Sequence, residues 1–64
     1  MIVCGAERAF TDVRTLSDVL ERLELDPRMV VVELNRAIVR RPALAETAVR
    51  TGDALELVHF VGGG

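Results

Sequence analysis

The chain has 64 residues, half of them hydrophobic, with a formal net charge of −2 and one cysteine. This length predicts one domain, and its core must be aliphatic because only Phe10 and Phe60 are aromatic. The lone cysteine, Cys4, excludes an internal disulfide and any two-cysteine metal or redox motif, so we expect a cytoplasmic protein. The acidic balance argues against nucleic acid as the main partner, and no apolar run reaches the roughly 18 residues of a membrane span.

A hairpin is the first predicted element. Residues 1–3 are apolar, and Gly5 supplies the positive φ that a tight turn demands. We expect both strands to be short, and we interpret Cys4 beside the turn as a small hydrophobic residue.

The clearest helix signal begins at Thr15, with Asp18 three residues later in the pattern of a capping box. Apolar residues follow at the spacing of one buried helix face, namely Leu16, Val19, Leu20 and Leu23. We expect a helix of about three turns that ends at Asp26 and Pro27, because proline cannot continue the hydrogen-bond ladder.

Residues 30–34 alternate as a strand with Val30, Val32 and Leu34 on one face. Asn35 and Arg36 then form a turn into a second strand, residues 37–40, which Pro42 stops. Asparagine tolerates the left-handed conformation of such a turn more readily than arginine does.

Residues 43–49 form a connector with about one helical turn, and we expect Leu44 and Val49 to pack on the core. Arg36, Arg40 and Arg41 form a local basic cluster in the sequence. We interpret the cluster as a solvated hairpin edge, with a docking patch for an acidic partner as the alternative.

Gly52 and Asp53 turn the chain into the last strand, residues 54–61, which places Leu55 and Leu57 on one face and Glu56, Val58 and Phe60 on the other. Because a lone carboxylate is costly to bury, Glu56 marks the exposed face. Val58 and Phe60 therefore lie in solvent, and with Val61 we predict that they dock a partner protein.

The sequence ends in Gly62, Gly63 and Gly64, which we expect to form a flexible tail after a domain of residues 1–61. Such an arm presents an unhindered carboxylate that can enter a narrow active site on another protein. His59 has no second histidine nearby and is interpreted as an ordinary residue on the inner face. With no phosphate loop and no pairing of a nucleophile with a base, we expect that the protein is not an enzyme and holds no metal.

The predicted order of elements gives an α+β domain in which a mixed sheet of four to five strands packs on one helix. With a diglycine end, the chain resembles the ubiquitin-like β-grasp fold. The likeness is closest to the sulfur carrier proteins of thiamine biosynthesis, the ThiS family. It rests on Thr15-Leu16, Leu25-Asp26-Pro27-Arg28, Val32-Glu33-Leu34-Asn35, Ile38-Val39 with Arg41, Gly52-Asp53, and His59 through Gly64. The family commonly has glycine at the position of Arg36.

The resemblance implies that a partner enzyme adenylates the carboxylate of Gly64 with ATP and that sulfur then replaces AMP. The transient acyl adenylate and the C-terminal 1-thioglycine are the only modified forms that it implies, and it implies no bound cofactor. The implied partners are the adenylating enzyme and the thiazole synthase that accepts the sulfur. Alternatives are the small subunit of molybdopterin synthase, another sulfur carrier of this fold, a protein modifier conjugated to lysines, and an interaction module with an inert tail.

Overall fold

The computed structural model describes residues 1–60, so the predictions made for Val61, Gly62, Gly63 and Gly64 lie outside the described residues. Within residues 1–60, five strands form one sheet in the order β2-β1-β5-β3-β4. Their bounds are β1 Ile2–Val3, β2 Ala6–Glu7, β3 Val30–Leu34, β4 Ala37–Val39 and β5 Ala54–His59. β1 runs parallel to β5 and the other neighbours are antiparallel, which confirms the predicted mixed sheet.

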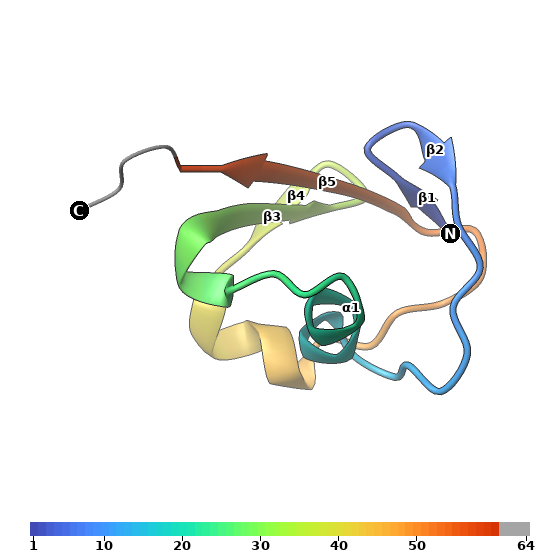
Figure 1. Ribbon diagram of the computed structural model, residues 1–64, viewed down its shortest axis with the longest axis horizontal. Coiled ribbons are helices and arrows are strands. Elements are labelled where there is room, and N and C mark those ends of the chain that lie inside the picture. The colour runs from blue at the N-terminus through green and yellow to red at the C-terminus, as the bar shows by residue number, and fades with distance from the viewer. Residues whose placement is uncertain (61–64) are drawn as a thin grey trace.

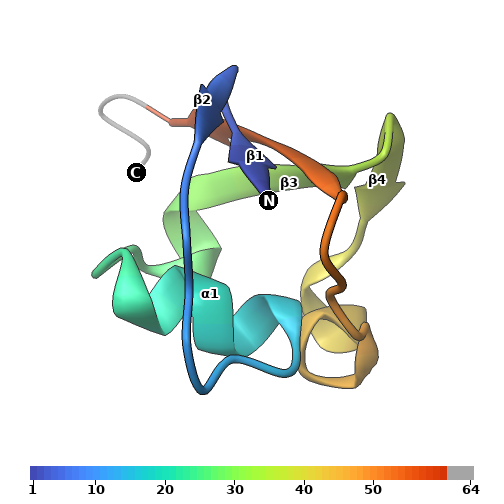
Figure 2. The ribbon, with the colours of Figure 1, turned by 90° about the vertical axis from the view of Figure 1, so that its right-hand side faces the viewer.

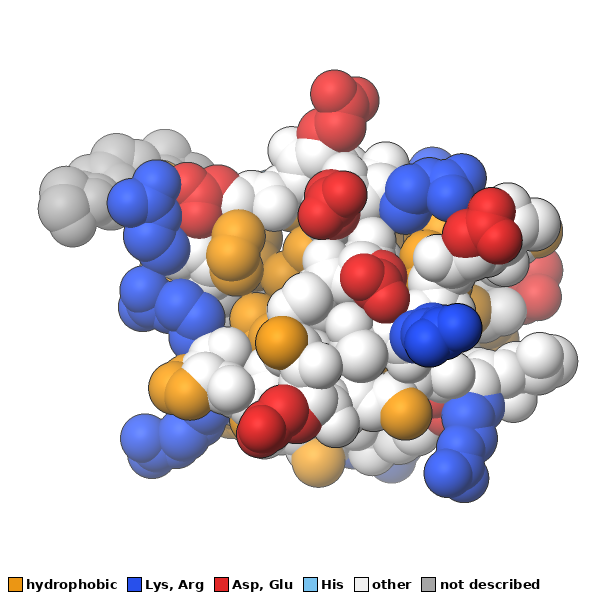
Figure 3. Space-filling model, turned by 90° about the horizontal axis from the view of Figure 1, so that it is seen from below, with side chains coloured by type: hydrophobic (Ala, Val, Ile, Leu, Met, Phe, Trp, Pro, Cys, Tyr) orange, Lys and Arg blue, Asp and Glu red, His pale blue; other side chains and the backbone are white. Residues whose placement is uncertain are grey.

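One face of the sheet is covered by the helix α1, Leu16–Arg22, and by the 3-10 helix η2, Arg41–Glu46 (Figures 1 and 2). We call the opposite face the outer sheet face. Among the described residues no helix is both long and apolar enough to cross a membrane. From the helical side, acidic and basic side chains are scattered with small apolar areas between them (Figure 3).

Thr15 caps α1 as predicted. Its hydroxyl accepts a hydrogen bond from the Asp18 N–H at 3.4 Å, and the Asp18 carboxylate accepts one from the Thr15 N–H at 3.0 Å. The same carboxylate accepts a second hydrogen bond from the Arg14 N–H at 2.8 Å. The Arg14 and Thr15 backbone bonds lower the pKa of Asp18, since they favour its charged form.

The helix is shorter than predicted, because it ends before Pro27 at a Schellman motif. The Leu25 N–H donates to the Leu20 carbonyl at 2.9 Å, and the Glu24 N–H donates to the Glu21 carbonyl at 3.0 Å. Glu24 occupies the left-handed position of the motif, with φ of 57°, where glycine is usual. The prediction that Asp26 and Pro27 end the helix is therefore wrong.

Asp26 and Pro27 instead begin a 3-10 helix, η1, Pro27–Met29. The Asp26 carboxylate accepts from the Arg28 N–H at 2.9 Å and pairs with the Arg28 guanidinium at 2.8 Å. Proline at the first helical position suits this start, because the N–H that it lacks would have no partner there.

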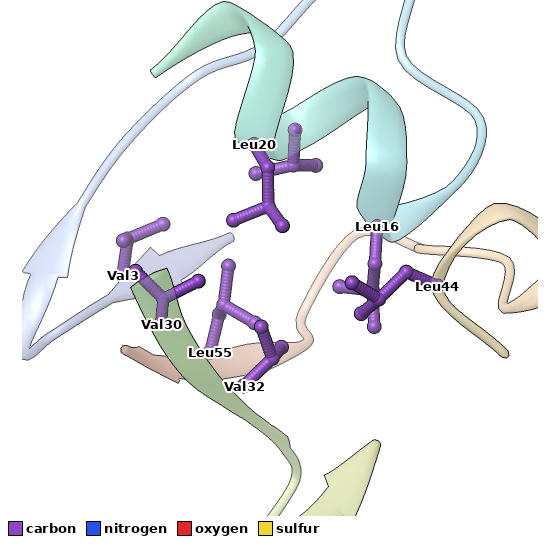
Figure 4. Packing of buried hydrophobic residues seen from close by; sticks show 8 residues of the cluster. Val3, Leu16, Leu20, Val30, Val32, Leu44 and Leu55 are labelled. Carbon is purple, nitrogen blue, oxygen red and sulfur yellow. The ribbon is translucent and has the colours of Figure 1, made fainter. Parts of the chain in front are cut away.

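The core lies between α1, η2 and the inner face of the sheet (Figure 4). It is aliphatic as predicted and consists of Val3, Leu16, Val19, Leu20, Val30, Val32, Leu44 and Leu55. Leu44 enters from η2, and Val49 packs against the cluster, so both predictions for the connector are confirmed. The buried apolar surface is the main favourable term in folding a domain of this size.

Both predicted hairpin turns have two residues with positive φ, as type I′ turns require. Cys4 and Gly5 have φ of 50° and 83° in the first turn, and Asn35 and Arg36 have φ of 51° and 70° in the second. Arg36 thus has a left-handed backbone conformation, which is unfavourable for a residue with a Cβ atom.

The Asn35 side chain also joins the second turn to the start of β5. Its amide nitrogen donates to the Asp53 carboxylate at 3.1 Å, and its amide oxygen accepts from the Ala54 N–H at 2.9 Å. The Asn35 bond, followed by the Arg50 N–H bond, lowers the pKa of Asp53. These contacts hold the turn at Asn35 and Arg36 against the start of β5.

Candidate docking surface

The exposure predicted for β5 is confirmed. Leu55 is 1% exposed and lies in the core, whereas Val58 is 55% exposed and Phe60 is 48% exposed. Glu56 is exposed on the same outer sheet face as Val58. Docking by Val58 and Phe60 stays a prediction, and Val61 lies outside the described residues.

The register of β3 with its neighbours extends the apolar area around Val58. Val31 lies directly opposite Val58, and Glu33 lies opposite both Glu56 on β5 and Ile38 on β4. Ile38 is 68% exposed, more than any other large hydrophobic residue within residues 1–60. Ile38 was not among the residues predicted for docking, although a two-residue turn at 35–36 already places it opposite Glu33.

Phe60 continues the pairing of β5 beyond His59, because its N–H donates to the Met29 carbonyl at 2.9 Å. Its side chain lines a cavity of about 190 Å³ at the edge of the sheet. Three arginines, Arg28, Arg40 and Arg41, line the same cavity. The end of β5 therefore combines a half-exposed aromatic ring with basic side chains.

The arginine cluster differs from the one that the sequence indicated. Arg36 lies in the turn at one end of β4, whereas Arg40 and Arg41 follow its other end. Arg28 from η1, and not Arg36, lies with Arg40 and Arg41 at the cavity. Its guanidinium holds the pKa of Asp26 down from 3.8 to about 2, with the Arg28 N–H bond adding to the effect.

His59 and Cys4 are both exposed. His59 lies opposite Val30 and so has the inner-face orientation that alternation predicts, but at the end of β5 it remains in solvent. Cys4 is an exposed free cysteine whose sulfur lies 3.9 Å from the Leu57 carbonyl oxygen, and its interpretation as a small hydrophobic residue stays a prediction. Among residues 1–60 no group of three histidine, cysteine or acidic side chains could hold a metal ion.

The outer sheet face, with Val58 and Ile38 exposed, has the apolar composition of a protein-binding surface. The mixed five-stranded sheet packs one face on the helix α1 and leaves the outer sheet face exposed. This architecture is that of the ubiquitin-like β-grasp domains. Two solved structures of a thiamine biosynthesis protein, ThiS, from Geobacter metallireducens have this arrangement. The crystal structure gives a TM-score of 0.82 at 32% identity, covering 98% of this chain and 96% of that one. The solution structure gives 0.78 at 32% identity, covering 98% and 85%.

The model of the ThiS family matches residues 1–64, and the chain belongs to this family. It is 38% identical over 53 residues to the sulfur carrier protein ThiS of Bacillus subtilis, covering 83% of this chain and 80% of that protein. It is also 42% identical over 64 residues to a thiazole synthase of Paramagnetospirillum magneticum. The match covers all of this chain but only 20% of the synthase, so the chain spans about a fifth of that relative.

Proposed function

We propose that the protein is a sulfur carrier of thiamine biosynthesis. The observation that carries the proposal is the family match over residues 1–64, together with the likeness to the Bacillus subtilis carrier over most of both chains. The named relatives are thiamine proteins, which favours this pathway over molybdopterin synthase.

The proposed reaction takes place at the carboxylate of Gly64. A carboxylate oxygen attacks the α-phosphorus of ATP, pyrophosphate leaves, and an acyl adenylate forms. A sulfur nucleophile at the oxidation level of sulfide, HS⁻ in the simplest case, then attacks the carbonyl carbon. AMP departs with the electron pair of the C–O bond, and the S–H proton is lost to solvent. The product is a thiocarboxylate, in which sulfur is held covalently on the protein instead of as free sulfide. In this proposal residues 62–64 are the tail and residues 1–61 the domain that presents it.

Two partner enzymes would supply the catalysis, and the chain itself would act as their carrier substrate. An adenylating enzyme would activate Gly64, and a thiazole synthase would take the sulfur. The second partner is supported by the Paramagnetospirillum magneticum relative, a thiazole synthase with a segment similar to this whole chain. Since the reaction consumes ATP, we place it in the cytoplasm.

The outer sheet face would bring the carrier to its partners. Val58 and Phe60 are the exposed apolar residues nearest to the proposed reaction centre in the sequence, and an exposed apolar group of this kind favours protein contact. The roles of Val58, Phe60 and Val61 in docking are part of the proposal.

Intact-mass spectrometry tests the proposal. The carrier is incubated with the adenylating enzyme, ATP and a sulfur donor, and the expected product gains the mass difference between sulfur and oxygen, located on Gly64 by fragmentation. Omission of ATP is the control and should leave the mass unchanged. If the mass stays the same while the enzyme loads another carrier, the protein is not a sulfur carrier for that enzyme.

A further inference from the structure

Two glutamates lie face to face at the centre of the outer sheet face. Glu33 on β3 is directly opposite Glu56 on β5, and in the part of the chain that the structure describes neither has an ion-pair partner. Like charges in directly opposed positions of an antiparallel pair destabilise a sheet. The folded protein therefore holds an unfavourable charge pair that no side chain within residues 1–60 neutralises.

Apolar side chains surround this pair of carboxylates. Ile38 lies beside Glu33 on β4, and the pair Val31 and Val58 forms the next outward-facing row toward the end of β5. A partner that covers these apolar groups also removes water from around the carboxylates. An unpaired carboxylate is costly to desolvate, so such a partner must bring a positive charge to this point.

The charge pair decides between possible occupants of the face. A second copy of the chain would bring four carboxylates together, and a nucleic acid or an anionic lipid surface would add further negative charge. A protein surface with a cationic side chain is the occupant that the charges favour. Arginine suits the position best, because its planar guanidinium carries five donors and can bond two carboxylates at once.

We propose that the outer sheet face binds a thiazole synthase surface that places an arginine between Glu33 and Glu56, within a frame of apolar contacts to Ile38, Val31 and Val58. The synthase is the chosen partner because a relative of this chain forms part of a thiazole synthase. This inference rests on the proposed function, and it adds the chemistry by which the partner is recognised. The glutamate pair lowers the stability of the free carrier and strengthens the complex.

The test compares the substitutions Glu33→Gln and Glu56→Gln with the control Glu46→Gln. Glu46 is exposed on η2, on the helical side of the sheet, and its substitution changes the net charge by the same amount. Each variant is melted alone, and its binding to the thiazole synthase of the same organism is measured by calorimetry at low and high salt.

We expect Glu33→Gln and Glu56→Gln to raise the melting temperature above that of Glu46→Gln and to weaken binding by about tenfold at low salt. Binding of the wild-type carrier should weaken with salt more than binding of the Glu33→Gln variant. Opposite effects on stability and affinity are not expected of a residue whose role is only structural. Equal affinity of all three variants would overturn the inference, as would a wild-type carrier that dimerises through this face in sedimentation experiments.

The sulfur-loading assay separates this inference from the proposed function. A carrier that gains sulfur on Gly64, but whose glutamate variants bind the synthase as the control does, keeps the proposed function and refutes the glutamate pair. A carrier that neither gains sulfur nor binds the synthase refutes both.

Discussion

Arg36→Gly is expected to stabilise the protein. Arg36 has φ of 70° in the turn between β3 and β4, and its side chain forms no ion pair within residues 1–60. A left-handed conformation costs a residue with a Cβ roughly 1–2 kcal/mol, and glycine avoids this cost. Glycine also gives the unfolded chain more freedom, which offsets about 0.4–1 kcal/mol of the gain. The net gain in the free energy of unfolding is about 0.5–1 kcal/mol, or roughly 2–8 °C in melting temperature.

Thermal unfolding followed by circular dichroism measures the effect, with Asn35→Gly as the matched comparison. Asn35 shares the turn and the positive φ, but its side chain also bonds Asp53 and Ala54. Each lost hydrogen bond costs about 1 kcal/mol, so Asn35→Gly should destabilise by about 1 kcal/mol despite the relief at φ. A lower melting temperature for Arg36→Gly would refute the reasoning, because it would mean that the arginine side chain stabilises the turn more than its backbone strains it.

Four further outcomes are expected. Glu24→Gly should raise stability by about 0.5–1 kcal/mol in thermal melts, because Glu24 holds the left-handed position at the end of α1. Phe60→Ala should lower the free energy of unfolding by less than about 2 kcal/mol, whereas Leu55→Ala should lower it by about 2–5 kcal/mol. The same Phe60→Ala variant should bind a partner enzyme more weakly in calorimetry. A loss of stability as large as that of Leu55→Ala would place Phe60 in the core. The free energy of unfolding should fall as the pH is lowered from about 4 to 2, because the carboxyl of Asp26 gains its proton near pH 3.8 in the unfolded chain but stays ionised to about pH 2 in the folded protein. In denaturant titrations across this range, the wild type should lose more stability than Asp26→Asn, which lacks this carboxyl. Deleting Gly64 should abolish sulfur delivery, because the new carboxylate on Gly63 stops about 3.5 Å short of the position that the Gly64 carboxylate reaches. A misplacement of even ~1 Å in an active site can lower the rate on the order of a hundredfold. Delivery at the native rate in a single-turnover assay would contradict this geometric argument.

Local signals in the sequence predicted local structure well. The capping box at Thr15 and the turn at Asn35 and Arg36 depend on neighbours within four residues, and both are confirmed. The end of α1 was missed because Glu24 takes a position that glycine normally signals. Nothing in the side chain of a glutamate indicates that its backbone will be left-handed.

Contacts between distant segments were the part that could not be predicted. Glu56 marked the exposed face, but its position opposite Glu33 depends on the register of β5 against β3, which packing of the core fixes. The cavity that joins Arg28 to Arg40 and Arg41 depends likewise on how η1 and η2 meet. The exposed residues of the docking surface could be named one by one, but their arrangement could not.

The central position of β5 has a consequence for how the protein is made. β5 is the last of the described elements in the chain, yet it lies between β1 and β3, and Leu55 fills the core from it. A growing chain that stops before Ala54 can form α1 and the hairpin of β3 and β4, but it leaves β1 with no strand to join it to the rest of the sheet. Pairing of β1 with β5 also spans most of the chain, which makes it a slow step in folding. Truncated products of synthesis should therefore stay unfolded and open to proteases. A chain that stops before Ala54 also lacks Val58 and Phe60, so under the proposed docking role it would not occupy a partner enzyme in place of the finished carrier.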